Sequence, residues 1–212
     1  MARPAKPAKK SAPAVPTRLE PVAQHCETCR QELAVCDGVH YGSAQTGYRL
    51  LCSRCFNEEV AEAGGLDFQH VQFDPLEMRD ATGGRHEFHF RVHLLGDRVA
   101  LDAFELRGGE PRGYQFQVLD DAEVDLFALM GRLVERMRRL LAACHLEEEH
   151  GRLHIKDLLA RGRIEWDENE DGRVPLIVID GREIPWEDFG RMLMTFEGWQ
   201  FKLEIRDKSE EI

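Results

Sequence analysis

The sequence has no apolar run of about 18 residues, the length that a membrane-spanning helix needs. It also has no continuous apolar segment behind its N-terminal lysines, because prolines interrupt residues 4–21. A secretory signal peptide requires such a segment. We therefore expect a protein without membrane association and with a cytoplasmic location.

Familiar enzyme signatures are missing as well. The chain contains no Gly-x-Ser-x-Gly, no phosphate-loop Gly-Lys pattern, no His-Glu-x-x-His and no dinucleotide-binding glycine motif. Their absence favours a non-enzymatic protein, although it does not exclude catalysis.

Positive charge is scarce outside the N-terminus. The net charge of the 212 residues is −11, whereas residues 1–24 carry a net charge of +4, which leaves −15 for the rest. Residues 1–24 are rich in Ala, Pro and Lys, a composition typical of a disordered basic tail. An acidic body is repelled by phosphate backbones, so we expect at most weak nucleic-acid binding.

Four of the six cysteines form two closely spaced pairs. Cys26 and Cys29 form one Cys-x-x-Cys pair, and Cys52 and Cys55 form a second, with 22 residues between the pairs. Two such turns supply the four thiolates that a tetrahedral Zn²⁺ site requires. A closed four-sulfur shell leaves no position for water or substrate, so the pattern predicts structural Zn²⁺ as the cofactor.

Two other roles for these cysteines fit the sequence less well than zinc binding does. A redox dithiol is possible, but two pairs in one short segment fit a metal better. Disulfides would require export from the cytoplasm, and no export signal is visible. Four of the six cysteines fall in the zinc pattern, which is typical of a protein in a reducing cytoplasm. His25, Cys36 and His40 lie nearby, and the sequence leaves open whether one of them joins the zinc shell.

The residues around the pairs indicate a particular arrangement. Short apolar pieces at 39–41 and 48–51, bounded by glycines, predict a β-hairpin. Residues 56–63 after the second pair predict a short helix that ends at Gly64-Gly65. Residues 25–65 thus contain a Cys-x-x-Cys turn, a hairpin, and a second Cys-x-x-Cys turn at the start of a helix. This order resembles a treble-clef zinc finger. The net charge of this segment, −3, argues against DNA binding.

The remaining residues, 66–212, predict an α+β domain, in which an antiparallel sheet carries two packed helices. Residues 66–84 have no clear period and are expected to form a packed connector. Apolar periodicity then predicts, in order, strands at 86–94, 98–106 and 114–118, a helix from Asp120 to about 147–151, a hairpin of 162–166 with 174–179, a helix at 184–196 and a strand at 199–205. The fold prediction is therefore α+β, with a treble-clef-like module at the N-terminus.

The acidic loop Asp167–Gly172 resembles the first half of a calcium-binding loop. Asp167, Asn169 and Asp171 occupy its first, third and fifth positions, with Gly172 at the sixth. The twelfth position is Val178, where a bidentate acid is needed. We therefore favour an acidic hairpin turn over a calcium site.

Three other groups of side chains are candidate sites. A histidine row could bind metal or transfer protons, but a solvent-facing sheet surface is the more frequent explanation. An arginine stripe could bind phosphate, but it more often forms a solvated helix face. Three tryptophans are expected in the core rather than on a binding surface. These groups are His86, His89 and His93 with Glu87 and Arg91; Arg132, Arg136 and Arg139; and Trp166, Trp186 and Trp199.

The run from Ile179 to Phe201 resembles segments of uncharacterised bacterial proteins, and this resemblance implies no activity. Our leading prediction is a zinc-stabilised, non-enzymatic interaction or regulatory protein that binds a protein partner in a bacterial cytoplasm. The alternative is a ligand-binding or enzymatic α+β domain with a small-molecule pocket near His89, His93 or the arginines. A third possibility is weak nucleic-acid binding through the tail and the zinc module.

Overall fold

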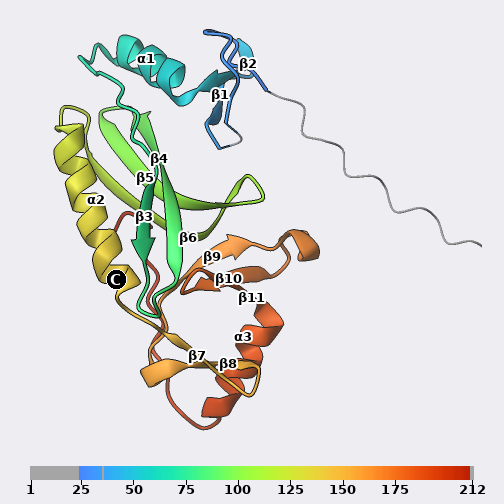
Figure 1. The fold of residues 1–212 in the computed structure, drawn as a ribbon. Coiled ribbons are helices and arrows are strands. Elements are labelled where there is room, and N and C mark those ends of the chain that lie inside the picture. The colour runs from blue at the N-terminus through green and yellow to red at the C-terminus, as the bar shows by residue number, and fades with distance from the viewer. Residues whose placement is uncertain (1–23, 35, 211–212) are drawn as a thin grey trace, which may run out of the picture.

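The computed structural model describes residues 24–34 and 36–210. The predicted basic tail therefore lies outside the described residues, except for Gln24. Helices and antiparallel sheets alternate along the described chain, which confirms the α+β class (Figure 1). No helix in this part of the chain is long and apolar enough to cross a membrane.

The N-terminal module, residues 25–65, consists of a hairpin followed by a helix. Strand β1 (Gly38–Ser43) pairs antiparallel with β2 (Gly47–Cys52), and α1 (Ser53–Gly64) begins at the next residue. Gly65 closes α1 in the left-handed conformation, with φ of 64°, and its N–H bonds to carbonyls of the last turn. The predicted hairpin and glycine-terminated helix are confirmed, and the helix starts three residues earlier than predicted.

The sheet body, residues 76–141, is a four-stranded antiparallel sheet with one long helix packed against it (Figure 1). Its strands are neighbours in chain order: β3 (Leu76–Arg79), β4 (Arg85–Leu95), β5 (Arg98–Arg107) and β6 (Glu110–Asp121). On β4, Phe88, Val92 and Leu94 are buried, as the period-two pattern predicts. They pack on Leu129 and Leu133 of α2 (Leu126–Leu141). The connector prediction missed β3, because four residues are too few to show a period.

Both ends of the predicted long helix are wrong. Asp120 and Asp121 end β6, and the helix is instead capped by Asp125, whose carboxylate accepts a hydrogen bond from Phe127 N at 2.9 Å. After α2, a hairpin of β7 (Leu146–Glu149) and β8 (Arg152–Ile155) replaces the predicted last turns. Strand β7 is acid-rich and has no apolar alternation, and the alternation of β8 covers only four residues, so the pattern gave no sign of this hairpin.

The C-terminal part, residues 145–210, contains a second sheet with strand order β11-β10-β9. Strands β9 (Gly162–Trp166) and β10 (Pro175–Ile179) form the predicted hairpin, and β11 (Arg182–Pro185) adds to it. Helix α3 (Trp186–Leu193) follows Pro185 directly, which shortens the predicted helix. Short 3-10 turns occur at Lys156–Leu158, Glu168–Glu170 and Met194–Phe196.

The predicted strand over 199–205 is absent, because residues 199–206 have no regular secondary structure and no described strand pairs with them. Period-two alternation makes a segment suitable for a sheet, but a strand also needs a neighbour for its backbone hydrogen bonds. The prediction that the three tryptophans lie in the core is also wrong. The exposed fractions of Trp166, Trp186 and Trp199 are 67%, 45% and 65%.

Candidate metal centre

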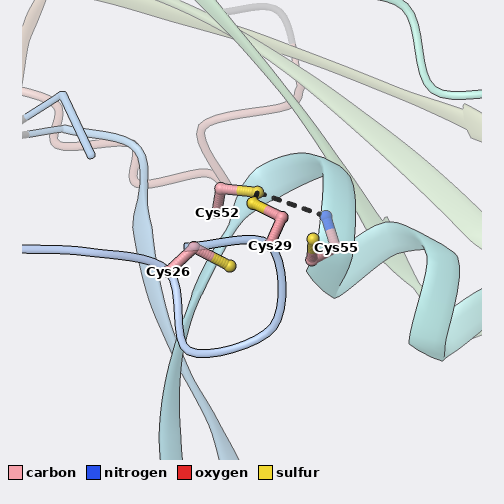
Figure 2. Close-up of side chains that lie close together, drawn as sticks. All are labelled: Cys26, Cys29, Cys52 and Cys55. Atoms are coloured by element: carbon pink, nitrogen blue, oxygen red, sulfur yellow. Dashed lines mark hydrogen bonds between the residues drawn. The ribbon is translucent and has the colours of Figure 1, made fainter. Parts of the chain in front are cut away.

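Four sulfur atoms converge at one point of the N-terminal module. The Sγ atoms of Cys26, Cys29, Cys52 and Cys55 all lie within 4.8 Å of one another (Figure 2). Cys29 is half-buried and the other three are buried. Within residues 24–34 and 36–210, no other group of three or more His, Cys, Asp or Glu side chains gathers its ligand atoms in this way.

A tight turn presents the first cysteine pair. Cys26 N donates to Gln31 O and Cys26 O accepts from Arg30 N, both at 2.9 Å, and Arg30 adopts a left-handed φ of 63°. Glu27 fixes this turn to the hairpin, because its N–H donates to Leu50 O at 2.8 Å while its carboxylate accepts from Leu50 N at 2.9 Å. The first pair is thereby held against β2, which ends in the second pair.

The second pair lies at the start of α1. Cys52 is the N-cap of the helix, and its Sγ accepts a hydrogen bond from Cys55 N at 3.4 Å (Figure 2). The N-terminal end of a helix carries a partial positive charge, so it favours the ionised form of a sulfur in this position. Leu33 and Leu51, both buried, contact the cysteines and close the site from within the module.

The donor set and spacing fit a tetrahedral metal ion. The Sγ atoms of Cys29 and Cys52 are 3.8 Å apart. With Zn–S bonds of about 2.3 Å, the edge of a tetrahedral four-sulfur shell is about 3.8 Å. These four residues could therefore hold a metal ion, and a shell completed by four protein sulfurs has no open position for a substrate.

The pKa values of the thiols show why a cation suits this cluster. Burial raises the pKa of Cys52 and of Cys55. Burial also opposes ionisation of Cys26, but hydrogen bonds from the backbone N–H groups of Cys29 and Cys52 outweigh it and lower its pKa to about 6. Since like charges this close repel each other, four thiolates need a bound cation to ionise together.

The three neighbouring candidates lie outside the four-sulfur group. His25, Cys36 and His40 do not bring a ligand atom into it. The Cys36 carbonyl instead accepts a hydrogen bond from Arg91 Nη1 of the sheet body at 2.9 Å, and burial raises the pKa of its thiol. Cys36 thus lies at the contact between the module and the sheet.

Asn57 connects the module to the sheet body. Its side chain is fully buried; Nδ2 donates to Val92 O at 2.7 Å, and Oδ1 accepts from Leu94 N at 2.8 Å. Strand β3 pairs with β4 only as far as Phe88, so the edge of β4 beyond that residue has no strand beside it. The amide of Asn57 substitutes for a neighbouring strand at this edge. No pattern in the sequence distinguished this asparagine.

The histidine row does not form a common site. His93 faces the module, where Nε2 lies 3.3 Å from Ser53 Oγ, and burial lowers its pKa to about 4. His89 pairs with Glu87 and stacks on Phe104. The predicted pocket near His89 and His93 is therefore not formed by these side chains.

His86 lies on the opposite face of β4 from His93. Its ring nitrogens are 3.0 Å from Asp80 and 2.8 Å from Glu105. Burial opposes protonation of His86, but its hydrogen bonds to Glu105 and Asp80 outweigh this and raise its pKa. Glu105 also accepts from Tyr114 N, at a bulge of β6 where Gly113 has a φ of 69° and any side chain would overlap Glu105.

The predicted arginine stripe is divided between two environments. Arg132 pairs with Asp120 and Arg139 is exposed, whereas Arg136 is buried. Arg136 donates to the carbonyl of Gln117 at 2.6 Å and to that of Ser209 at 2.7 Å. It therefore fastens the C-terminal residues to β6 and does not face a solvent-exposed anion site.

The acidic loop is the turn between β9 and β10. Asp167 is buried; its carboxylate accepts from Asn169 N at 2.9 Å, and its backbone carbonyl accepts from Gly172 N at 3.0 Å. The carboxylate of Asp167 thus organises the turn, and in the described structure the acids of this loop do not converge on a shared point.

Comparison with known proteins divides the chain into three segments. Residues 25–67, 69–142 and 145–210 match three different family models, described as Domain of unknown function DUF7685, DUF7686 and DUF7713 respectively. No curated protein and no solved structure matches the chain significantly. The four cysteines lie within the first segment, the sheet body within the second, and the smaller sheet with α3 within the third. The chain is thus built from three consecutive segments, each similar to a different domain of unknown function.

Proposed function

We propose that the chain is a zinc-stabilised, non-enzymatic interaction or regulatory protein with one structural zinc site. The observation that carries this proposal is the closed cluster of four cysteine sulfurs. Thiolate ligands select zinc over hard cations such as Mg²⁺ and Ca²⁺, and the 3.8 Å spacing between Cys29 and Cys52 suits Zn–S bonds. Zinc in such a shell contributes to folding and does not activate water.

The order of elements around the sulfurs supports a treble-clef arrangement of the N-terminal module. A turn carries Cys26 and Cys29, the β1–β2 hairpin follows, and α1 begins at the second pair. The module is attached to the sheet body through Asn57 and Arg91, so it is held as a projecting part of the protein (Figure 1). A rigid projecting surface of this kind is suited to binding a protein partner.

A metal analysis tests the zinc site. Protein purified without added metal should contain one zinc per chain, and Cys52→Ser should abolish it. Cys144→Ser is the matched control, because Cys144 is half-buried and lies outside the module. The proposal fails if the protein contains no zinc and Cys52→Ser leaves its thermal stability unchanged.

The interaction role requires a separate test. Partner capture should be compared between the zinc-loaded chain and Cys52→Ser, with the identities of the captured proteins read by mass spectrometry. A specific protein retained by the former and lost by the latter would support the proposal. Retention of nucleic acid in a salt-dependent manner would instead favour the third possibility, which the acidic net charge of the module opposes.

One observation favours a second candidate, a small-molecule site in the α+β body. A hollow of about 430 Å³ lies where α2 ends, with Ala81, Thr82, Cys144, His145, Lys156 and Asp157 among its lining residues. This volume is within the range of ligand sites, roughly 300–1,000 Å³. A thermal-shift screen of metabolites should then give a stabilising hit that Lys156→Ala removes, whereas a screen without hits would count against this candidate.

A further inference from the structure

The segment Trp199–Arg206 exposes an unusual row of apolar side chains. Trp199, Phe201, Leu203 and Ile205 have exposed fractions of 65%, 89%, 72% and 69%. The backbone groups of residues 200–206 make no hydrogen bond to the backbone of any other described residue. A contiguous apolar row whose backbone donors and acceptors are not used in a sheet is a typical site for adding a strand from another chain.

Both ends of this segment are fixed. At its start, Trp199 N donates to Phe196 O at 2.9 Å, and the two aromatic rings pack edge to face. At its end, the buried Arg136 donates to the carbonyls of Lys208, at 3.1 Å, and Ser209. Because its ends are held, the segment has less conformational entropy to lose on pairing than a free tail would have.

The sequence of the segment is complementary to itself in one antiparallel register. If two copies pair with Leu203 opposite Leu203, then Lys202 of each copy faces Glu204 of the other. In the same register, Phe201 faces Ile205 twice, on the apolar side of the ribbon. Opposite charges and aromatic–branched pairs directly across a sheet each contribute roughly 0.2–1 kcal/mol.

The neighbouring registers are unfavourable. Centring the pair on Lys202 places two lysines opposite each other, and centring it on Glu204 places two glutamates opposite each other and Lys202 opposite Arg206. A shift that pairs Lys202 with Leu203 mixes polar and apolar side chains on both faces. Side-chain chemistry therefore favours the register centred on Leu203 over its immediate neighbours.

We propose that Trp199–Arg206 pairs antiparallel with the same segment of a second copy of this chain, about a two-fold axis at Leu203. The pairing supplies partners for the backbone groups of residues 200–205, which have none among the backbone groups of the described residues, and it gathers the apolar row of each copy on one face of a shared ribbon. A two-fold axis is the commonest symmetry of soluble dimers. A two-stranded ribbon alone is only marginally stable, so we expect a concentration-dependent dimer.

Charge reversal tests the pairing. Sedimentation velocity over a range of concentrations should show a dimer for the natural sequence, and Lys202→Glu should weaken it at least tenfold by facing two acids across the ribbon. The double variant Lys202→Glu/Glu204→Lys should restore the dimer, because it exchanges the partners of each pair. Both side chains affected, Lys202 and Glu204, are exposed, so unchanged zinc content and circular dichroism will show that the variants fold.

Disulfide cross-linking tests the register. In a Cys36→Ser/Cys144→Ser background, Leu203→Cys should form a disulfide dimer on mild oxidation, because directly opposite Cα atoms lie about 4.5–5.5 Å apart. Phe201→Cys is the matched control, since its opposite residue is Ile205 of the other copy and not a second cysteine. A monomer at every concentration, a dimer indifferent to Lys202→Glu, or equal cross-linking of both variants would overturn the proposal. These outcomes do not depend on the zinc site, so they leave the proposed function to be judged separately.

Discussion

The N-terminal module and the sheet body are stabilised by different means. The buried core of the module comprises Cys26, Cys52, Cys55, Leu33 and Leu51, so three of its five members are cysteines of the four-sulfur cluster. The core of the sheet body unites β4, β5 and β6 with α2 through aliphatic and aromatic side chains, fully buried at Leu129, Leu133 and Met137. A segment as short as the module buries too little apolar surface to fold alone, and metal–sulfur bonds can supply the difference.

The two regions share one element, α1. Its first turn holds Cys52 and Cys55, whereas Ala61 on its later turns is buried in the core of the sheet body. Asn57 lies between them and bonds to β4. The comparison therefore predicts that metal removal and core mutation damage different regions, and that changes at Asn57 affect the coupling between them.

The largest effect is expected from removing the metal. Chelation, or Cys26→Ser, should unfold residues 25–52 and the first turn of α1, because bound zinc contributes about 10–16 kcal/mol in comparable zinc-finger peptides. Hydrogen–deuterium exchange should show loss of protection in β1 and β2 while β5 and α2 stay protected. Simultaneous loss of protection in both regions would show that they fold as one unit and would contradict their separate stabilisation.

Truncating the core of the sheet body should produce the reverse pattern. Leu129→Ala should lower the free energy of unfolding by about 2–5 kcal/mol, since this leucine is fully buried between α2 and the sheet. Zinc content should remain unchanged. Glu135→Ala on the same helix is the control; its side chain is 59% exposed, and surface changes usually stay within about 0.5 kcal/mol. Equal effects of the two variants would contradict the assigned core.

An effect of similar size should follow from Asn57→Ala. This change leaves Val92 O and Leu94 N without their side-chain partner, and each unsatisfied buried group costs about 1–3 kcal/mol. We expect zinc to stay bound while exchange at Leu94 and limited proteolysis between residues 65 and 75 increase. Glu58→Ala, at an exposed neighbouring position, should leave both unchanged. Loss of zinc in Asn57→Ala would mean that the module cannot hold its metal without the sheet.

The smallest effect concerns two histidines of β4 whose pKa values shift in opposite directions. Burial lowers the pKa of His93 from 6.5 to about 4, so below pH 6.5 the unfolded chain binds the extra proton and stability falls until about pH 4. His86 has a raised pKa because of Glu105 and Asp80, so its contribution is fully present below pH 6.5 and is lost as the pH rises through the raised pKa.

Urea unfolding across pH will separate these contributions. Relative to the natural sequence, His93→Gln should reduce the loss of stability on acidification, and His86→Gln should reduce the stability on the acidic side alone. Protonation of the cysteines also changes stability with pH, but it acts equally on all variants. The contribution of each histidine is therefore obtained from the difference between its variant and the natural sequence. Identical pH profiles for the two variants would refute the opposite shifts.

Sequence reasoning succeeded where one residue pattern determines one local structure. The spacing of Cys26, Cys29, Cys52 and Cys55 predicted a cluster that the structure brings together, and the alternation around Phe88 to Leu94 predicted β4 and its buried face. The metal's identity remains a prediction, because sulfur spacing restricts the ion without naming it.

Predictions from the sequence failed where a contact with a distant part of the chain determines the local structure. Residues 199–205 alternate as clearly as β4 does, yet no described strand lies beside them. The end of β6 and the start of α2 depend on which of several adjacent acids caps the helix, and Asp125 does so. Asn57 was missed because a single polar residue on a helix shows its role only through the sheet edge that it meets.

The position of Asn57 would give a metal ion held by the four cysteines a protective role against misassembly. While α1 is intact, its amide occupies the backbone groups of β4 at Val92 and Leu94, beyond the reach of β3. If loss of the metal lets the unwinding of α1 extend from its first turn to Asn57, that stretch becomes a bare sheet edge, the kind of surface through which proteins aggregate. Zinc starvation is therefore expected to lower the solubility of this protein before it unfolds the sheet body.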